Sequence, residues 1–433
     1  PFLLTEPVSL LLGPDESVSG AVGDVAREFE EQTRDYWQNW VRGLALPLNY
    51  QEAVIRAAIT LKLCVFEETG AIVAAHTTSI PEAANTERNW DYRFCWLRDA
   101  TYTLIALDAF GLSAEAAAWR NWLLYAVAGD AADTQIMYGI GGERHLVEWE
   151  ADWLPGYHGA QPVRIGNGAY RQLQLDVYGE VMDAFHTYRM YGMEEDEEAW
   201  RLELELLPFV ESRWSEAGSG IWERRSQPRH YVTSRVLCWV AVDRAIKGVE
   251  RFGLDGPVER WRRLRAQIHE DVCRHGYSER RGAFVEALGE ENLDASTLLI
   301  PLFGFLPPDD PRVVSTMETL RRELMQDGFL HRYDSGKSDD GLPAGEAPFL
   351  ACTLWLADNL AMMGRKDEAR EVFERVLSVR NDLGLLAEEY DPAAGRQLGN
   401  FPQGFSHVGI VNTAQNLSGG AGAFLESEEE EKR

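Results

Sequence analysis

Lysine is scarce in this chain of 433 residues, which carries only five lysines among its 42 basic side chains. Acidic side chains number 70, and the formal net charge is −28. Such a surface repels phosphates, which argues against a nucleic-acid partner. No uninterrupted apolar run is long enough to span a bilayer, so we expect no membrane partner.

Paired cysteines and metal-binding histidine motifs are also missing. The nine histidines form no HxxxH or HExxH pattern, and no GxSxG elbow occurs. The glycines of segment 139–144 have no Lys-Ser/Thr after them, so a phosphate-binding loop is not expected there. The five cysteines are scattered through apolar runs, which is typical of buried small hydrophobes. They are Cys64, Cys95, Cys238, Cys273 and Cys352. We expect neither a metal nor a cofactor.

What the chain does have is a succession of helical patterns from Tyr50 onward. Strand signals between them are few and short, which indicates an all-α domain. The predicted helices span 51–67, 99–111, 113–129, 170–192, 195–214, 228–250, 254–274, 294–305, 310–326, 346–364, 366–381 and 402–418.

The connections between these helices alternate in length. Short turns occur near Leu112, Gly192, Phe252 and Gly364, and long loops separate the resulting hairpins. Antiparallel neighbours joined in this way place all long loops at one end. Six hairpins predict a closed (α/α)6 barrel, a toroid of paired helices. An open solenoid is the alternative, but the hairpins are too unequal for a strict repeat. Function is expected on the long loops.

The first long loop contains the segment Asn89–Asp99, which combines aromatic rings with two carboxylates and two guanidiniums. One interpretation is that Asp99 caps the helix that follows. The other is a sugar-binding platform, since small-molecule sites combine apolar rings with convergent polar groups.

Two further loops carry acidic groups. Glu223 follows an indole, and burial would keep it protonated as a general acid requires. Pairing with Arg225 would do the opposite, and the residues alone slightly favour that pairing. Glu388 and Glu389 together offer one base and one ligand or structural partner. Arg164 is either a ligand clamp or a solvated charge. Two acidic sites on one face suggest glycoside hydrolysis, which uses two carboxyls.

Several motifs in one order closely resemble glycoside hydrolase family 15, the family of glucoamylases, glucodextranases and prokaryotic trehalases. The motifs are segments 88–100, 220–223, 228–230, 388–392 and 399–403. The resemblance covers about residues 45–420. It implies an (α/α)6 barrel and hydrolysis, with inversion, of an α-glucosidic bond at the non-reducing end.

The resemblance also assigns roles. It implies that Glu223 is the general acid, Glu388 the general base, and Tyr92 a holder of the attacking water. Arg98 and Asp99 would bind hydroxyls of the terminal glucose. The other expected substrate-binding residues are Trp96, Arg164, Trp222, Arg332 and Glu389.

Some features depart from the family pattern. Arg224 and Arg225 follow the acid, where an apolar residue commonly precedes the arginine, and Arg224 would lower the pKa of the acid. Residues 1–44 are expected to be an N-terminal segment and helical linker, the tail of a missing β-sandwich, with strand remnants at segments 2–4 and 8–12. Residues 45–420 would form the barrel and 421–433 a disordered acidic tail.

The sequence therefore predicts an inverting, exo-acting α-glucoside hydrolase acting on malto- or isomalto-oligosaccharides or trehalose. A non-catalytic or a phosphorolytic sugar-binding toroid is the alternative. We expect this protein to bind a small-molecule carbohydrate as its partner, and a homodimer is the assembly to test. The expected location is the cytoplasm. Since the chain begins at Pro1, its N-terminus is expected to be incomplete, and secretion stays open.

Overall fold

The computed structural model describes residues 3–13, 17–84, 86–129, 131–192 and 197–419, which fall into two compact units divided after Ala45. In the first unit the helical linker is present as α1 (Val22–Arg42). The strand expected over segment 8–12 is wrong, because that segment has no partner strand and its leucines are exposed. Phe2 and the expected acidic tail lie outside the described residues.

The second unit is built from helices, and each predicted helix has a counterpart in it. The expected helix 294–305 is the shortest, because it consists of a 3-10 turn, η4 (Ala295–Leu298), and one α-turn that ends before Gly304 at φ +72°. The helices are α2 (Gln51–Cys64), α3 (Leu97–Asp108), α4 (Ser113–Ala126), α5 (Asp176–Met190), α6 (Glu197–Arg213), α7 (Val232–Phe252), α8 (Val258–His275), α9 (Leu299–Leu302), α10 (Pro311–Leu324), α11 (Leu350–Met362), α12 (Lys366–Ser378) and α13 (Gly404–Leu417).

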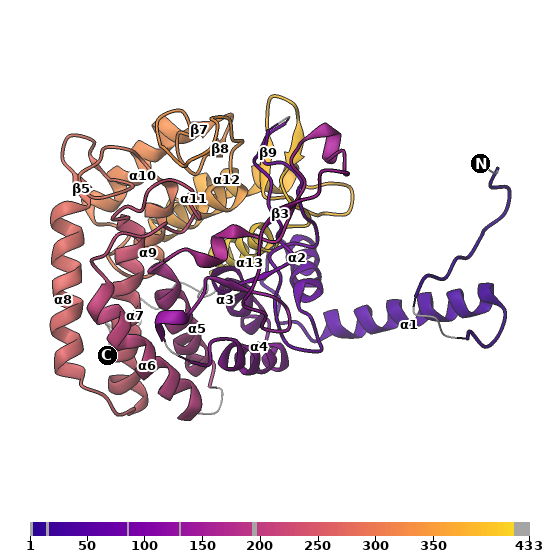
Figure 1. Ribbon diagram of the computed structural model, residues 1–433, viewed down its shortest axis with the longest axis horizontal. Helices are drawn as coiled ribbons and strands as arrows, with labels where there is room; N and C mark the ends of the chain where they lie inside the picture. The colour runs from indigo at the N-terminus through magenta and orange to yellow at the C-terminus, as the bar shows by residue number, and fades with distance from the viewer. Residues whose placement is uncertain (1–2, 14–16, 85, 130, 193–196, 420–433) are drawn as a thin grey trace. The chain divides into compact units, whose positions relative to one another are not determined.

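The helices close into two concentric rings (Figure 1). The inner ring runs α3, α5, α7, α9, α11 and α13, each packed on the next, and α13 packs back on α3. The remaining helices, α2, α4, α6, α8, α10 and α12, pack outside. This closure confirms the (α/α)6 barrel and excludes the open solenoid.

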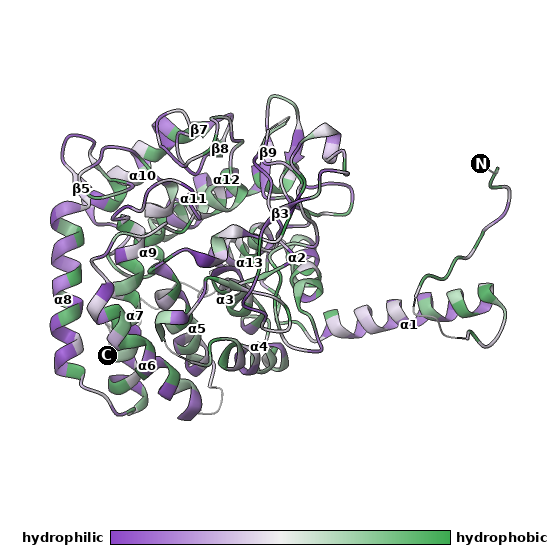
Figure 2. Cartoon of the chain, in the orientation of Figure 1, coloured by the Kyte–Doolittle hydropathy of each residue, from purple (hydrophilic) through white to green (hydrophobic). Residues whose placement is uncertain are grey.

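The hydrophobic pattern explains which helices are inside. Every residue of α13 is buried, as expected for a helix surrounded by neighbours. In α8 the buried residues are Trp261, Leu264, Ile268 and Val272, a single stripe at helical spacing. Figure 2 shows the corresponding mixture of hydrophobic and hydrophilic residues along α8. Among the described helices, none has the length and apolar character that crossing a membrane requires.

The long loops carry short antiparallel strand pairs. Single bridges join loop to loop, as between Ala75 and Gln403, Asp294 and Tyr333, and Phe349 and Glu389. These bridges fix distant loops against one another and so position the side chains they carry. The pairs are β1 (Cys95–Trp96) with β2 (Met137–Tyr138), β3 (Trp149–Glu150) with β4 (Arg164–Ile165), β5 (Tyr277–Ser278) with β6 (Ala283–Phe284), β7 (Met325–Gln326) with β8 (Phe329–Leu330), and β9 (Glu389–Asp391) with β10 (Arg396–Leu398).

Candidate active site

Two adjoining chambers lie among the long loops and share five lining residues: Tyr92, Trp96, Trp222, Glu223 and Arg332. We call the first the base chamber. It encloses about 320 Å³, and its other lining residues are Ala74, Arg98, Asp99, Phe349, Glu388, Gln403 and Phe405.

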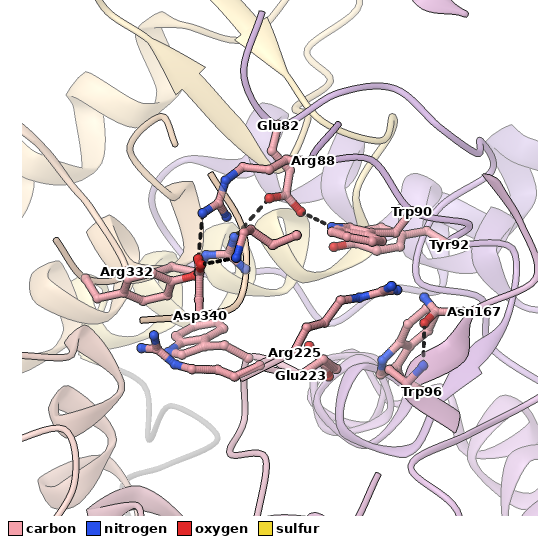
Figure 3. Close-up of a pocket in the computed structure, with 15 residues that line it drawn as sticks. Glu82, Arg88, Trp90, Tyr92, Trp96, Asn167, Glu223, Arg225, Arg332 and Asp340 are labelled. Carbon is pink, nitrogen blue, oxygen red and sulfur yellow. Dashed lines mark hydrogen bonds and ion pairs between the residues drawn. The ribbon is translucent and has the colours of Figure 1, made fainter. Parts of the chain in front are cut away.

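The second, which we call the arginine chamber, encloses about 480 Å³. Its other lining residues are Glu82, Arg88, Trp90, Asn167, Ala169, Arg224, Arg225, Tyr333, Asp340 and Leu342 (Figure 3). Glu223 lines both chambers, whereas Glu388 lines only the base chamber.

Glu223 is held by Arg98, the first polar residue of α3. The guanidinium of Arg98 donates to the Glu223 carboxylate at 2.9 Å and to the carbonyl of Ile221. Burial raises the pKa of Glu223 above its ordinary value, and the charge of Arg98 opposes that rise. The net direction suits a group that must hold a proton. The Glu223 backbone has φ 51°, which is strained for a residue with a side chain.

The expected effects of Arg224 and Arg225 on Glu223 are wrong, because both guanidiniums point elsewhere. Arg225 pairs with Glu148 at 2.5 Å. Arg224 is buried and pairs with Glu286 at 2.7 Å and Asp294 at 3.1 Å. The cation that faces the acid is Arg98 instead.

Glu388 lies just before β9 and is almost fully buried. The hydroxyl of Tyr92 donates to its Oε1 at 2.8 Å, while Oε2 is buried and has no hydrogen-bond partner among the described residues. Burial, reinforced by the charge of Glu82, raises the pKa of Glu388 to about 8, while Arg332 and the Tyr92 hydrogen bond oppose the rise. Glu388 therefore ionises at a higher pH than an ordinary carboxyl group.

Arg98 and Asp99 are brought together at the start of α3, where Arg98 Nε donates to Asp99 at 3.1 Å. Both side chains line the base chamber, as a pair that binds sugar hydroxyls must. Asp99 lies in the first helical turn, and the N-cap Trp96 has no side-chain cap. The wall beside them is formed by Tyr92 and Trp96, whose rings meet edge to face with centroids 5.3 Å apart.

Arg164 and Glu389 are close to the chambers but line neither. Arg164 is a buried residue of β4 whose guanidinium lies 4.7 Å from the centre of the Trp90 ring, so it is not a solvated charge. The guanidinium of Arg225 also stacks on Trp90, at 4.1 Å. Glu389 accepts a hydrogen bond from the Ala347 backbone at 3.2 Å and faces Arg332 at 3.6 Å. Arg164 and Glu389 therefore contact residues that line the chambers, Trp90 and Arg332, without lining a chamber themselves.

Trp222 and Arg332 line both chambers, and sequence reasoning missed the acidic residues that orient them. The Trp222 indole donates to Asp294 at 2.9 Å. Arg332 pairs with Glu346, and its Nη2 donates to Glu82 at 3.2 Å. These carboxylates lie outside the motifs, and no local spacing distinguishes them from surface charges. Among the described residues, no cluster of His, Cys, Asp or Glu is arranged to hold a metal ion.

Comparison with known proteins agrees with this geometry. The model of the glycosyl hydrolases family 15 matches residues 49–415. The trehalase of Mycobacterium tuberculosis is 41% identical over 398 residues, which cover 91% of this chain and 58% of that protein. The trehalase of Thermoplasma acidophilum is 38% identical, covering 89% of this chain and 66% of the relative. The chain thus spans about three fifths of the length of the curated relatives that it matches.

Solved structures share the fold. A bacterial glucoamylase complexed with acarbose superposes with a TM-score of 0.73 at 14% identity, covering 93% of this chain and 61% of that one. A glycosidase variant in complex with glucose has a TM-score of 0.66 at 18% identity, covering 84% and 96%. The family match over most of the length, together with these relatives, confirms the resemblance read from the motifs, and the chain belongs to the glycosyl hydrolases family 15.

Proposed function

We propose that this chain is an inverting, exo-acting α-glucoside hydrolase, with Glu223 as general acid and Glu388 as general base. The observation that carries the proposal is that both carboxyls line one chamber, each fixed by its own partner. Arg98 holds Glu223, and Tyr92 holds Glu388. Hydrolysis of a glycosidic bond needs two carboxyls in distinct environments, one protonated and one ionised.

In the proposed reaction Glu223 protonates the glycosidic oxygen while Glu388 removes a proton from a water on the opposite face of the sugar ring. Inversion leaves room for that water when the carboxyls are roughly 6.5–9.5 Å apart. Oε1 of Glu388 is occupied by Tyr92, so Oε2 is the acceptor for the water proton. Tyr92 thereby fixes which oxygen acts.

The base chamber suits the terminal glucose. Arg98 and Asp99 would bind its hydroxyls, and Trp96, Trp222 and Arg332 would shape the walls. The leaving sugar would occupy the arginine chamber, beyond Glu223. We propose Arg164 and Glu389 as supports of these walls, because they line neither chamber.

We propose trehalose as the substrate, because the relatives at 38–41% identity are named trehalases. Two chambers that meet at Glu223 also correspond to the two sugar units of a disaccharide. Maltose and isomaltose are the alternatives, and one structural neighbour is a glucoamylase. A phosphorolytic or a non-catalytic toroid is disfavoured by the presence of both carboxyls in one chamber.

The test is glucose release from trehalose, maltose and isomaltose, each with and without added phosphate. We expect phosphate-independent release, fastest from trehalose. Release only with phosphate, accompanied by glucose 1-phosphate, would indicate the transferase. Absence of release from all three would contradict hydrolysis. We also propose that the protein acts in the cytoplasm, because the described cysteines are free thiols. A homodimer stays part of the proposal, to be checked by light scattering.

A further inference from the structure

Glu82 is a buried carboxylate that the family motifs do not include, and it lies between two residues of the chamber walls. Its Oε1 accepts from the indole N–H of Trp90 at 2.7 Å, and its Oε2 accepts from Arg332 Nη2 at 3.2 Å. Figure 3 shows Glu82 between these two partners. Burial raises the pKa of Glu82 above its ordinary value, while the charge of Arg332 and the Trp90 hydrogen bond oppose that rise. Because both oxygens accept hydrogen bonds, one from a cation, the geometry of this position fits the ionised form.

Arg332, the cation held by Glu82, is itself a wall of the base chamber. Its guanidinium lies 4.9 Å from the centre of the Phe349 ring. It also pairs with Glu346 on one side and faces Glu389 at 3.6 Å on the other. Three carboxyls thus surround one guanidinium at the edge of the chamber that contains Glu388.

We propose that Glu82 is a positioning residue that fixes Arg332 beside the catalytic base, and that its negative charge sets the pH at which Glu388 ionises. The proposal rests on the proposed function, in which Glu388 is the general base. Glu82 touches neither Glu388 nor a reacting atom, so it acts through the electric field and through Arg332.

The charges around Glu388 come from several loops and act in opposite directions. Glu82 and Glu346 oppose its ionisation, while Arg332 and the hydroxyl of Tyr92 favour it. The charges of Glu82 and Arg332 also act on the hydroxyl of Tyr92, which lies 2.8 Å from Glu388 Oε1. The titratable and charged groups that face this region are Glu82, Tyr92, Arg332, Glu346, Glu389 and, elsewhere in the lining of the base chamber, Arg98, Asp99 and Glu223.

The distinguishing experiment is the pH dependence of kcat/KM for trehalose in the Glu82→Gln variant. The amide keeps the length of the side chain but removes its charge, so ionisation of Glu388 becomes easier. We expect the acidic limb to move to lower pH by about one unit or more. KM should rise severalfold, because Arg332 keeps Glu346 but loses the carboxylate that fixes its Nη2.

Arg332→Met supplies the opposite perturbation, because it removes the positive charge that favours ionisation. Its acidic limb should move to higher pH. A general loss of packing would lower the activity of both variants, but it would not move the acidic limb in opposite directions. Opposite shifts would therefore reflect the opposite charges of the two contacting residues. If the acidic limbs of both variants coincide with the wild-type limb, the proposal is overturned.

Two matched variants separate charge from packing. Glu286→Gln removes an equally buried carboxylate bound to Arg224, and its acidic limb should coincide with the wild-type limb. Glu82→Asp keeps the charge and shortens the side chain, so the limb should stay within a few tenths of a unit even if kcat falls. An equal downward shift in Glu286→Gln, or in Glu82→Asp, would contradict the proposal. Circular dichroism melts establish that each variant is folded.

Failure of this proposal differs from failure of the proposed function. Glu388→Gln should abolish activity at every pH if Glu388 is the base. If that variant stays active, the assignment of the base is wrong. If it is inactive while Glu82→Gln leaves the acidic limb in place, the base is correct and the role of Glu82 is refuted.

Discussion

Removing the hydroxyl of Tyr92 tests the proposed role of Glu388 with a small perturbation. It deletes one hydrogen bond and keeps the aromatic ring in the wall of the base chamber. In Tyr92→Phe the donor that lies 2.8 Å from Glu388 Oε1 is lost. The edge-to-face contact with Trp96, with centroids 5.3 Å apart, is available to Phe as well. The effect should therefore be on the base and not on the shape of the chamber.

The expected magnitude follows from the kind of hydrogen bond. A bond to a charged group contributes about 1.5–3 kcal/mol. If this is lost in the transition state, kcat/KM falls roughly ten- to 150-fold. The same donor favours ionised Glu388, so its loss raises the pKa of that group. The acidic limb should then move to higher pH, and part of the lost rate should return as the pH rises.

The assay is the release of glucose from trehalose across the pH range, with kcat and KM separated. A matched control is Tyr390→Phe, which changes a tyrosine of β9 two residues from Glu388. The Tyr390 ring packs on Phe329, with ring centroids 5.1 Å apart. The control should keep its activity within about threefold. A Tyr92→Phe enzyme with unchanged kcat/KM and an unmoved acidic limb would refute the role given to this hydrogen bond.

Three further variants address the acid, the geometry of the base and the stability of the fold. Glu223→Gln should lose roughly 10²–10⁴-fold on trehalose but far less on α-glucosyl fluoride, whose leaving group needs little protonation; equal losses would contradict the acid assignment. Gly399→Ala adds a Cβ that would lie 2.9 Å from the Cβ of Glu388, so kcat should fall roughly a hundredfold. Gly395→Ala, equally left-handed but distant from Glu388, should keep its activity. His407 is buried with a pKa lowered to about 4, so the native state binds fewer protons than the unfolded state between pH 6.5 and 4. Its contribution to the free energy of unfolding, up to about 3 kcal/mol, is lost as the pH falls through that window. In His407→Gln, the free energies of unfolding from urea melts at pH 7 and at pH 4.5 should therefore differ less than they do in the wild type.

The fold was largely accessible from the sequence because two independent signals agreed. The inner helix α13 contains no Asp, Glu, Lys or Arg, outer helices such as α8 carry one buried stripe, and the alternating connections order the helices into hairpins. The exception is the short α9, which ends before Gly304 at φ +72°, and the hydrophobic periodicity did not predict that end. The apolar segment 8–12 was expected to be a strand, but apolar residues without a pairing partner do not make one.

The candidate site was only half accessible. Residues in long motifs, such as Tyr92, Glu223 and Glu388, could be predicted as site residues because the motifs combine aromatic and charged side chains, and the three line one chamber. The directions in which the side chains point could not be predicted from the sequence, because a residue that is a neighbour in sequence need not be a neighbour in space. Arg224 and Arg225 flank the acid in the chain, yet each pairs with a carboxylate from another loop. Glu82 and Asp294 stayed unrecognised for the same reason.

The anomeric configuration of the products tests the central claim most directly. Trehalose joins two glucose units through their α-anomeric carbons, so attack by water at one carbon with inversion releases one β-glucose and one α-glucose. A nucleophilic carboxylate, about 5 Å from its partner, would instead return α-glucose from both halves. Early-time proton NMR of the anomeric region distinguishes the two before mutarotation. Equal initial amounts of the α- and β-anomers, lost in Glu388→Gln, are the predicted result. Initial α-glucose alone would contradict the general-base role of Glu388 and the account built on it.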